Sequence, residues 1–336
     1  MLRRGAPILV ALAAIAGARV RAADTAAAGG LLLVANKGDH TLGIIDPVAG
    51  RQVATVKQSG ITGHEVVASP DGKTAYVPIY GDSGVGRPGT DGRTMDVIDI
   101  ASRRRVATID FGAPERPHCA VFGPDGRLYV TTEITDSIKV IDPRTNTVVG
   151  TLPTGQKESH MLVLSGDGRT AYTSNVGAGT VSVIDVATRK VTAVVTAAAR
   201  AQRIALSTDG RRVFTADQDV PRLAVIDTKT NKLALGVALP GVAYGTAPTP
   251  DGRFLVLALP GLNQVAVLDL KSMEVVRTLD VPKAPQEVLV RPDGRVAYVS
   301  CDASGQVAVI DLTEWKVERL IPAGPMADGL AWAVGH

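Results

Sequence analysis

Three of the five histidines in this 336-residue chain occupy one position of an internal repeat. His64, His118 and His160 each stand seven residues before an Asp-Gly pair. Neutral imidazoles that converge from neighbouring repeats can bind one Zn, Cu, Fe or Mn ion and leave coordination positions open. The spacing therefore predicts a single divalent-metal site at these histidines. No local motif such as H-E-x-x-H specifies the ion.

The same repeat position is polar in the other units, where it holds Gln202, Tyr244, Gln286 and Asp328. We expect these residues to bind a ligand together with Glu133, Tyr80 and Arg87. Glu158 and Glu65 are the candidate catalytic bases, because a carboxylate beside histidines can accept a proton or orient an imidazole. The alternative is a hydrated polar ring without a ligand, since a channel mouth is exposed to water. Descent of the repeats from a common unit can by itself place histidines at the same position in several blades.

The element that must position these side chains is a repeat of about 42 residues. Asp-Gly pairs begin at Asp71, Asp125, Asp167, Asp209, Asp251 and Asp293, with one spacing of 54 and four of 42. Each unit contains apolar or alternating stretches, such as Leu128–Thr131 and Val181–Asp185, separated by polar turns. This pattern predicts four short antiparallel strands per unit, which is typical of a β-propeller blade.

The two ends of the repeat array complement each other. The first unit begins directly at Leu31–Ala35 without an opening strand, and the segment Asp328–Ala333 has no strands after it. We expect the C-terminal strand to complete the first blade, because closure removes exposed sheet edges. The predicted fold is therefore an all-β, seven-bladed propeller in one domain over residues 31–336.

The second unit carries about a dozen extra residues within Tyr80–Arg93. A long loop on a rigid scaffold commonly acts as a lid or binding loop, although a tolerated surface excursion is the alternative. Its glycines match G-x-G-x-x-G, but Pro88 interrupts the match and no strand–turn–helix context follows, so no nucleotide site is predicted. The chain has no C-x-x-C-H motif, which argues against covalent haem.

Residues 1–22 have the basic start, apolar run and small-residue end of a secretory signal peptide, and residues 23–30 read as a linker. We therefore expect a periplasmic or secreted protein that is not integral to a membrane. The leader holds four arginines and no acid, so its removal changes the net charge from +3 to −1. This charge and the 4% aromatic content argue against nucleic-acid binding. Cys119 and Cys301 lie in different units, so no disulfide is expected, and Cys119 should pack between blades.

The segments Tyr129–Thr132, Tyr172–Asn175 and Val181–Asp185 resemble the YVTN-type propeller repeats of secreted bacterial and archaeal proteins. The resemblance covers nearly the whole chain after the leader. It implies a seven-bladed propeller of the cell envelope but no particular activity. Related propellers include lactonases, lyases and the haem- or copper-bearing domains of nitrogen-oxide reductases.

Three functions follow as hypotheses. The first is a propeller whose histidine-rich channel mouth binds a metal ion or a small ligand. The second is a metal-dependent lyase, hydrolase or oxidoreductase that uses the three histidines as ligands and a nearby glutamate as base. The third is a scaffold that binds another envelope protein and has no ligand. The sequence alone does not choose among them.

Overall fold

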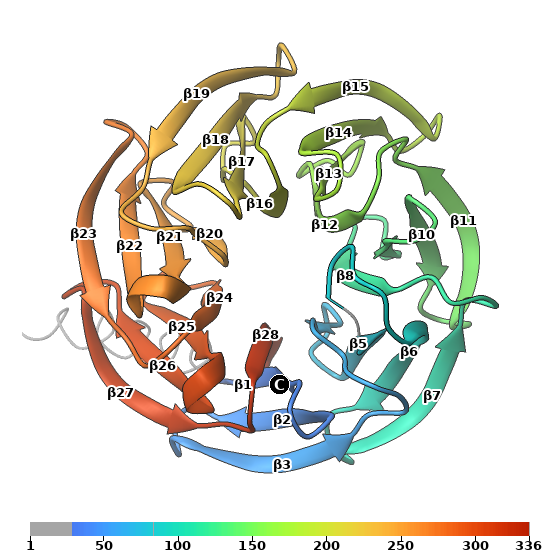
Figure 1. Ribbon diagram of the computed structural model, residues 1–336. Coiled ribbons are helices and arrows are strands. Elements are labelled where there is room, and N and C mark those ends of the chain that lie inside the picture. The colour runs from blue at the N-terminus through green and yellow to red at the C-terminus, as the bar shows by residue number, and fades with distance from the viewer. Residues whose placement is uncertain (1–28, 83, 336) are drawn as a thin grey trace, which may run out of the picture.

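Seven four-stranded antiparallel sheets surround a central channel in the computed structural model, which describes residues 29–82 and 84–335 (Figure 1). This arrangement confirms the predicted seven-bladed propeller. The first blade has the strand order β28-β1-β2-β3, so the last strand of the chain completes it. The predicted signal peptide, residues 1–22, lies outside the described residues, as does His336.

Within each blade, the four strands follow one another in order from the channel outward. The first three blades contain β28 (Ala327–Val334), β1 (Gly30–Asn36), β2 (Thr41–Asp46) and β3 (Arg51–Lys57); β4 (Val67–Ala68), β5 (Thr74–Gly81), β6 (Asp91–Asp99) and β7 (Arg104–Asp110); and β8 (Pro117–Phe122), β9 (Leu128–Thr132), β10 (Ser137–Asp142) and β11 (Thr147–Pro153).

The next two blades contain β12 (Ser159–Leu164), β13 (Thr170–Asn175), β14 (Thr180–Asp185) and β15 (Lys190–Thr196); and β16 (Ala201–Leu206), β17 (Arg212–Asp217), β18 (Arg222–Asp227) and β19 (Lys232–Ala238). The last two contain β20 (Thr246–Pro248), β21 (Phe254–Leu259), β22 (Gln264–Asp269) and β23 (Glu274–Asp280); and β24 (Pro285–Val290), β25 (Val296–Cys301), β26 (Gln306–Asp311) and β27 (Lys316–Pro322). Two 3-10 turns, η1 (Pro260–Leu262) and η2 (Asp302–Ser304), complete the described elements.

The repeated turns have the chemistry that the sequence predicts. The glycine of each of the six repeated Asp-Gly pairs that begin at Asp71 to Asp293 has a positive φ, for example 67° at Gly72 and 70° at Gly168, which glycine adopts without strain. The aspartate that ends each third strand accepts backbone N–H groups in the next turn, as Asp46 does from Val48 and Ala49. These turns set the strand register that repeats around the ring.

The apolar core lies between neighbouring blades. One cluster joins the second and third blades through Tyr76, Val97, Ala120 and Leu128. Because both faces of an inner blade are covered by apolar side chains, the inner strands hold their first residues firmly at one mouth of the channel. No helix among the described residues has the length and apolarity to cross a membrane.

Candidate functional site

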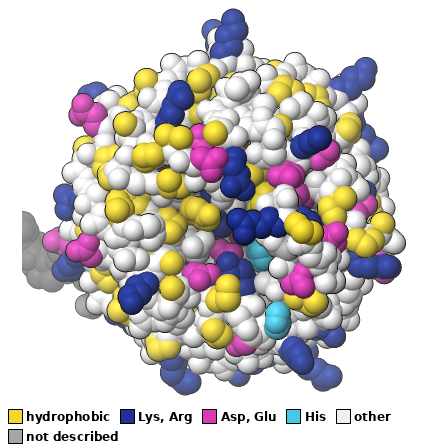
Figure 2. Space-filling view, in the orientation of Figure 1, with side chains coloured by type: hydrophobic (Ala, Val, Ile, Leu, Met, Phe, Trp, Pro, Cys, Tyr) yellow, Lys and Arg dark blue, Asp and Glu magenta, His cyan; other side chains and the backbone are white. Residues whose placement is uncertain are grey.

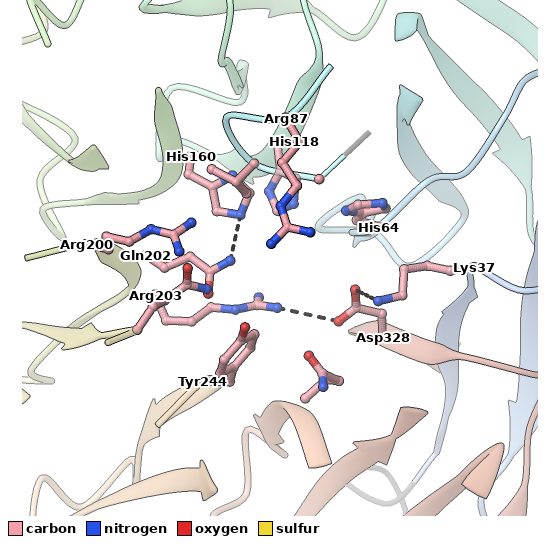
Figure 3. Close-up of a pocket in the computed structure, with 14 residues that line it drawn as sticks. Lys37, His64, Arg87, His118, His160, Arg200, Gln202, Arg203, Tyr244 and Asp328 are labelled. Carbon is pink, nitrogen blue, oxygen red and sulfur yellow. Dashed lines mark hydrogen bonds and ion pairs between the residues drawn. The ribbon is translucent and has the colours of Figure 1, made fainter. Parts of the chain in front are cut away.

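A cavity of about 360 Å³ opens at the mouth where the inner strands begin (Figure 3). All seven residues of the predicted ring line it: His64, His118, His160, Gln202, Tyr244, Gln286 and Asp328. Figure 2 looks onto this mouth, where basic side chains gather at the centre with a histidine among them. The seven residues at this repeat phase therefore share one cavity.

The three histidines contact one another through their rings. His118 stacks on His160, with ring centroids 3.7 Å apart and an interplanar angle of 30°. His64 meets His118 edge-on, at 5.5 Å and 88°, and stacks on Tyr80 at 4.6 Å. Stacked imidazoles bring their π faces together rather than directing their nitrogen lone pairs at one point. Among the residues that the structure describes, no group of three His, Cys, Asp or Glu side chains is arranged to hold a metal ion.

Burial keeps two of these imidazoles neutral at physiological pH. The pKa of His64 is lowered to about 4, mainly by burial; Asp328 opposes this shift, and the positive groups around the cavity act in the same direction as burial. Burial also lowers the pKa of His118 well below its usual value, with the neighbouring histidines acting in the same direction. The Nδ1 atom of His118 is buried without a hydrogen-bond partner. Both rings therefore offer neutral donor and acceptor atoms rather than charge.

Glu133 lies directly behind His160 and is only 2% exposed. Its Oε2 is 3.1 Å from His160 Nδ1 and accepts the Tyr80 hydroxyl at 2.8 Å. Its Oε1 accepts Arg116 Nη1 at 3.3 Å. Burial alone would raise the pKa of Glu133, but the hydrogen bonds from His160 and Tyr80 lower it, so the group is a carboxylate.

A second buried cluster, which we call the Arg203 cluster, joins Arg203, Glu65, Glu287 and Asp328 at the cavity. Arg203 Nη1 is 2.7 Å from Glu65 Oε1 and 2.6 Å from Glu287 Oε2, and Nη2 is 3.4 Å from Asp328 Oδ1. Lys37 reaches Asp328 at 3.0 Å (Figure 3). Burial raises the pKa of Glu65 to about 8 against the opposing effect of Arg203, and it also raises the pKa of Glu287.

The other predicted site residues fall into different places. Tyr80 is fully buried behind the histidines, whereas Arg87 is exposed and points into the cavity (Figure 3). Glu65 belongs to the Arg203 cluster and does not line the cavity. Glu158 lines a neighbouring cavity of about 390 Å³ together with Glu133 and Arg87. The sequence thus placed the two candidate bases near the histidines, but neither faces the central cavity.

The inserted loop lies at the same mouth, as its position in the second blade suggested. Gly84, Val85 and Arg87 line the central cavity. The Arg87 carbonyl accepts Arg116 Nη2 at 2.7 Å, and the Gly86 N–H approaches Glu133 Oε1 at 3.5 Å. The loop is therefore tied to the carboxylate that contacts His160.

Sequence reasoning missed several cavity residues: Lys37, Arg200, Arg203 and Gln218. A signal for Arg203 was present, because the position after the ring residue holds Glu65, Arg203 and Glu287 in three different units. Opposite charges at one repeat phase can meet across a channel, and here they do. Both cysteines are free and buried, and Cys119 packs in the interblade core against Leu162, as expected.

Comparison with known proteins gives partial matches. Residues 122–253 match the family model of the cytochrome D1 heme domain, and not specifically the YVTN-type repeat. A 113-residue segment is 34% identical to the seven-bladed beta-propeller protein Rv1057 of Mycobacterium tuberculosis and covers 32% of this chain. That segment spans only 26% of the relative, so the relative as a whole is much longer than the match.

Solved structures share the fold at low identity. Hydrazine synthase of Kuenenia stuttgartiensis superposes with a TM-score of 0.71 at 20% identity, over 85% of this chain and 93% of that one. The periplasmic gluconolactonase PpgL of Pseudomonas aeruginosa gives 0.71 at 19%, over 90% and 99%. Dihydro-heme d1 dehydrogenase NirN in complex with DHE gives 0.66 at 17%, over 92% and 76%. The chain is thus a seven-bladed β-propeller with a polar, histidine-rich cavity at one channel mouth.

Proposed function

We propose that the channel-mouth cavity binds a small organic anion that carries a carboxylate. The observation that carries this proposal is the charge of the lining, which holds four cations and one carboxylate, that of Asp328. The cations are Lys37, Arg87, Arg200 and Arg203. A volume of about 360 Å³ is in the range of small-molecule sites. The signal peptide predicted from residues 1–22 supports a binding function in the periplasm or outside the cell.

Two of the four cations are available to a ligand. Lys37 and Arg203 are already engaged by buried carboxylates. Arg200 has only a 3.7 Å contact with Asp219, and both side chains are more than 40% exposed. Arg87 extends into the cavity from the inserted loop (Figure 3). A guanidinium can bind a carboxylate through two parallel hydrogen bonds, so these two arginines would recognise the anionic group. The neutral histidines would contact the rest of the ligand.

The test is calorimetric titration with succinate and citrate, and with glycerol as an uncharged probe. We expect the two acids to bind and the double variant Arg87→Ala/Arg200→Ala to bind at least about tenfold more weakly, since one charge-assisted hydrogen bond contributes roughly 1.5–3 kcal/mol. Arg144→Ala is the matched control, because Arg144 is exposed and pairs only within its own turn. Equal affinity of the double variant and the control, or no binding of either acid, would contradict the proposal.

A second candidate ligand is a haem-type tetrapyrrole, which the match of residues 122–253 to the cytochrome D1 heme domain favours. The donor set fits such a group. The buried, unpartnered Nδ1 of His118 and the ring of His64 are neutral imidazoles that could bind iron, and Arg87 and Arg200 could bind the acid side chains. The iron would supply redox chemistry. Titration with hemin decides the question: a shifted Soret band that His118→Ala abolishes supports this ligand, and an unchanged spectrum excludes it.

The three-histidine metal site stays a prediction. His160 is engaged by Glu133, and His118 stacks on its ring, so ligation by all three residues needs new ring orientations. Elemental analysis of protein purified without a histidine tag tests it. Stoichiometric metal that the triple variant His64→Ala/His118→Ala/His160→Ala loses would support a metal-dependent site, and metal-free protein with no tight uptake on titration would exclude it.

A further inference from the structure

We propose that His160 is a general base at the channel mouth, that Glu133 positions it, and that the cavity hydrolyses an ester whose acyl part carries a second carboxylate. This inference rests on the proposed binding of an organic anion and names the reaction of that site. It is carried by one chain of hydrogen bonds, in which every partner requires the same form of His160.

This series of hydrogen bonds begins at Gln218, whose side-chain N–H₂ donates to Gln202 Oε1. With its Oε1 turned to Gln218, the Gln202 amide has its own N–H₂ toward His160 Nε2, at 3.4 Å (Figure 3). A donor at Nε2 requires a lone pair on Nε2. The opposite nitrogen, Nδ1, lies 3.1 Å from the Glu133 carboxylate, which can only accept. Both neighbours therefore select the Nδ1–H tautomer, which leaves Nε2 as a base directed at the cavity.

Glu133 is held in place by groups that do not face the cavity themselves. The Tyr80 hydroxyl donates to Oε2 at 2.8 Å, and Arg116 Nη1 donates to Oε1 at 3.3 Å. Arg116 is in turn bound to Asp91 and to the Arg87 carbonyl. A carboxylate fixed behind an imidazole orients the ring and stabilises the imidazolium that forms when the base accepts a proton.

The nucleophile must come from solvent. Among the described residues, the side-chain partners of His160 are Glu133 and Gln202, and no hydroxyl or thiol donates to its Nε2. Cys119 follows His118 in sequence, but its Sγ contacts the Leu162 carbonyl, and burial raises the pKa of the thiol to about 12. A water molecule is therefore the group that His160 can activate. The 3.4 Å contact with Gln202 is long enough to be replaced by that water.

His160 Nε2 takes a proton from water, and the water oxygen bonds to the acyl carbon while the carbonyl π electrons move to its oxygen. With Arg200 holding the second carboxylate of the ester, Arg87, which points into the cavity beside His118, can stabilise that oxyanion (Figure 3). The C=O bond re-forms, the acyl C–O bond breaks, and the imidazolium returns its proton to the leaving oxygen. The products are a carboxylic acid and an alcohol, and no oxidant or reductant is needed.

The probe is the mono-4-nitrophenyl ester of fumarate, whose trans carboxylate cannot attack its own ester, and the reaction is followed by release of nitrophenolate near neutral pH. We expect turnover above the rate with free imidazole, and a loss of at least about 100-fold in kcat in His160→Gln, which is the usual contribution of a positioned base. Glu133→Gln should lose about tenfold or more in kcat with little change in KM, because the substrate does not touch Glu133. Glu274→Gln, on the exposed outer strand β23, is the matched control.

Other outcomes overturn the inference. If His160→Gln keeps wild-type turnover, or if Glu158→Gln loses it while His160→Gln does not, His160 is not the base. If the wild type binds succinate in calorimetry but hydrolyses the ester no faster than imidazole does, the inference fails and the proposed binding function stands. If it binds no succinate either, both fail.

A measurement on the wild type keeps the inference testable if the variants do not fold. Nitrogen-15 NMR of the histidine rings distinguishes the two neutral tautomers. We expect the His160 signals to show a protonated Nδ1 and an unprotonated Nε2. The opposite tautomer would leave no base facing the cavity and would overturn the proposal.

Discussion

Arg203 on β16 and Glu65, just before β4, are 138 positions apart in the chain, and their Nη1 and Oε1 atoms lie 2.7 Å apart. The same guanidinium also forms ion pairs with Glu287 and Asp328. One cation is thus shared by carboxylates from three other blades, at the cavity that the histidines line. The contact exists only because the ring closes, so it couples closure of the propeller to the shape of the site.

Removing this cation should destabilise the fold strongly. In Arg203→Met the buried Glu65 and Glu287 lose this cation and Asp328 keeps only Lys37. Breaking a buried ion pair from one side typically costs about 3–5 kcal/mol. Urea denaturation followed by circular dichroism measures the loss. When measured above about pH 8, where Glu65 is ionised in the folded wild type, the double variant Arg203→Met/Glu65→Gln should recover part of it, because one uncompensated charge is gone. If the double variant is no more stable than the single one, the electrostatic explanation is incorrect.

Protonation of Glu65 should contribute to the pH dependence of the free energy of unfolding. Burial raises its pKa from 4.5 in the unfolded chain to about 8 in the folded protein. The folded state therefore binds more protons between these values, and this contribution to the free energy of unfolding falls as pH rises from about 4.5 to about 8. Burial acts on Glu287 in the same direction.

Glu65→Gln should flatten that decline, since an amide does not titrate. The comparison is the free energy of unfolding of the wild type and the variant, measured in urea at several pH values across this window. Glu274→Gln, an exposed outer-strand substitution, serves as control and should leave the slope unchanged. Identical slopes in the wild type and Glu65→Gln would show that Glu65 does not take up a proton on folding.

Gly329 should be the most sensitive glycine at the closing strand. Its N–H donates to the His64 carbonyl at 2.9 Å, and a Cβ at this position would lie 2.5 Å from that oxygen and 2.6 Å from Glu65 Cα. Those contacts are with backbone atoms, which cannot move aside without shifting the strand.

Gly329→Ala should therefore lower the thermal midpoint by several degrees and weaken ligand binding at the same time, because His64 lines the cavity. Gly166→Ala is the control, since a Cβ there meets no atom within 4 Å. Scanning calorimetry and calorimetric titration give the two readouts. An unaffected Gly329→Ala protein would show that the last strand tolerates a wider spacing than the structure has.

The sequence by itself determined the architecture, because local chemistry repeats in it. Each Asp-Gly turn and each strand-ending aspartate satisfies backbone groups within a few residues. The sevenfold repetition of this unit therefore predicts the four-stranded blade, the ring of seven blades and the closure of the ring by the last strand. The same phase placed His64, His118 and His160 at one mouth, since equivalent residues of a propeller share a face.

Tertiary structure alone decided how those residues are used. Whether three imidazoles converge on a metal or stack depends on ring rotation, which packing against Tyr80 and Glu133 sets and which no spacing encodes. The Arg203 cluster likewise joins blades that are distant in sequence, and burial rather than residue type raises the pKa of Glu65. Repeat phase fixes which side chains meet, whereas burial, rotamer and hydrogen-bond direction fix what they do, and these arise only when the ring is closed.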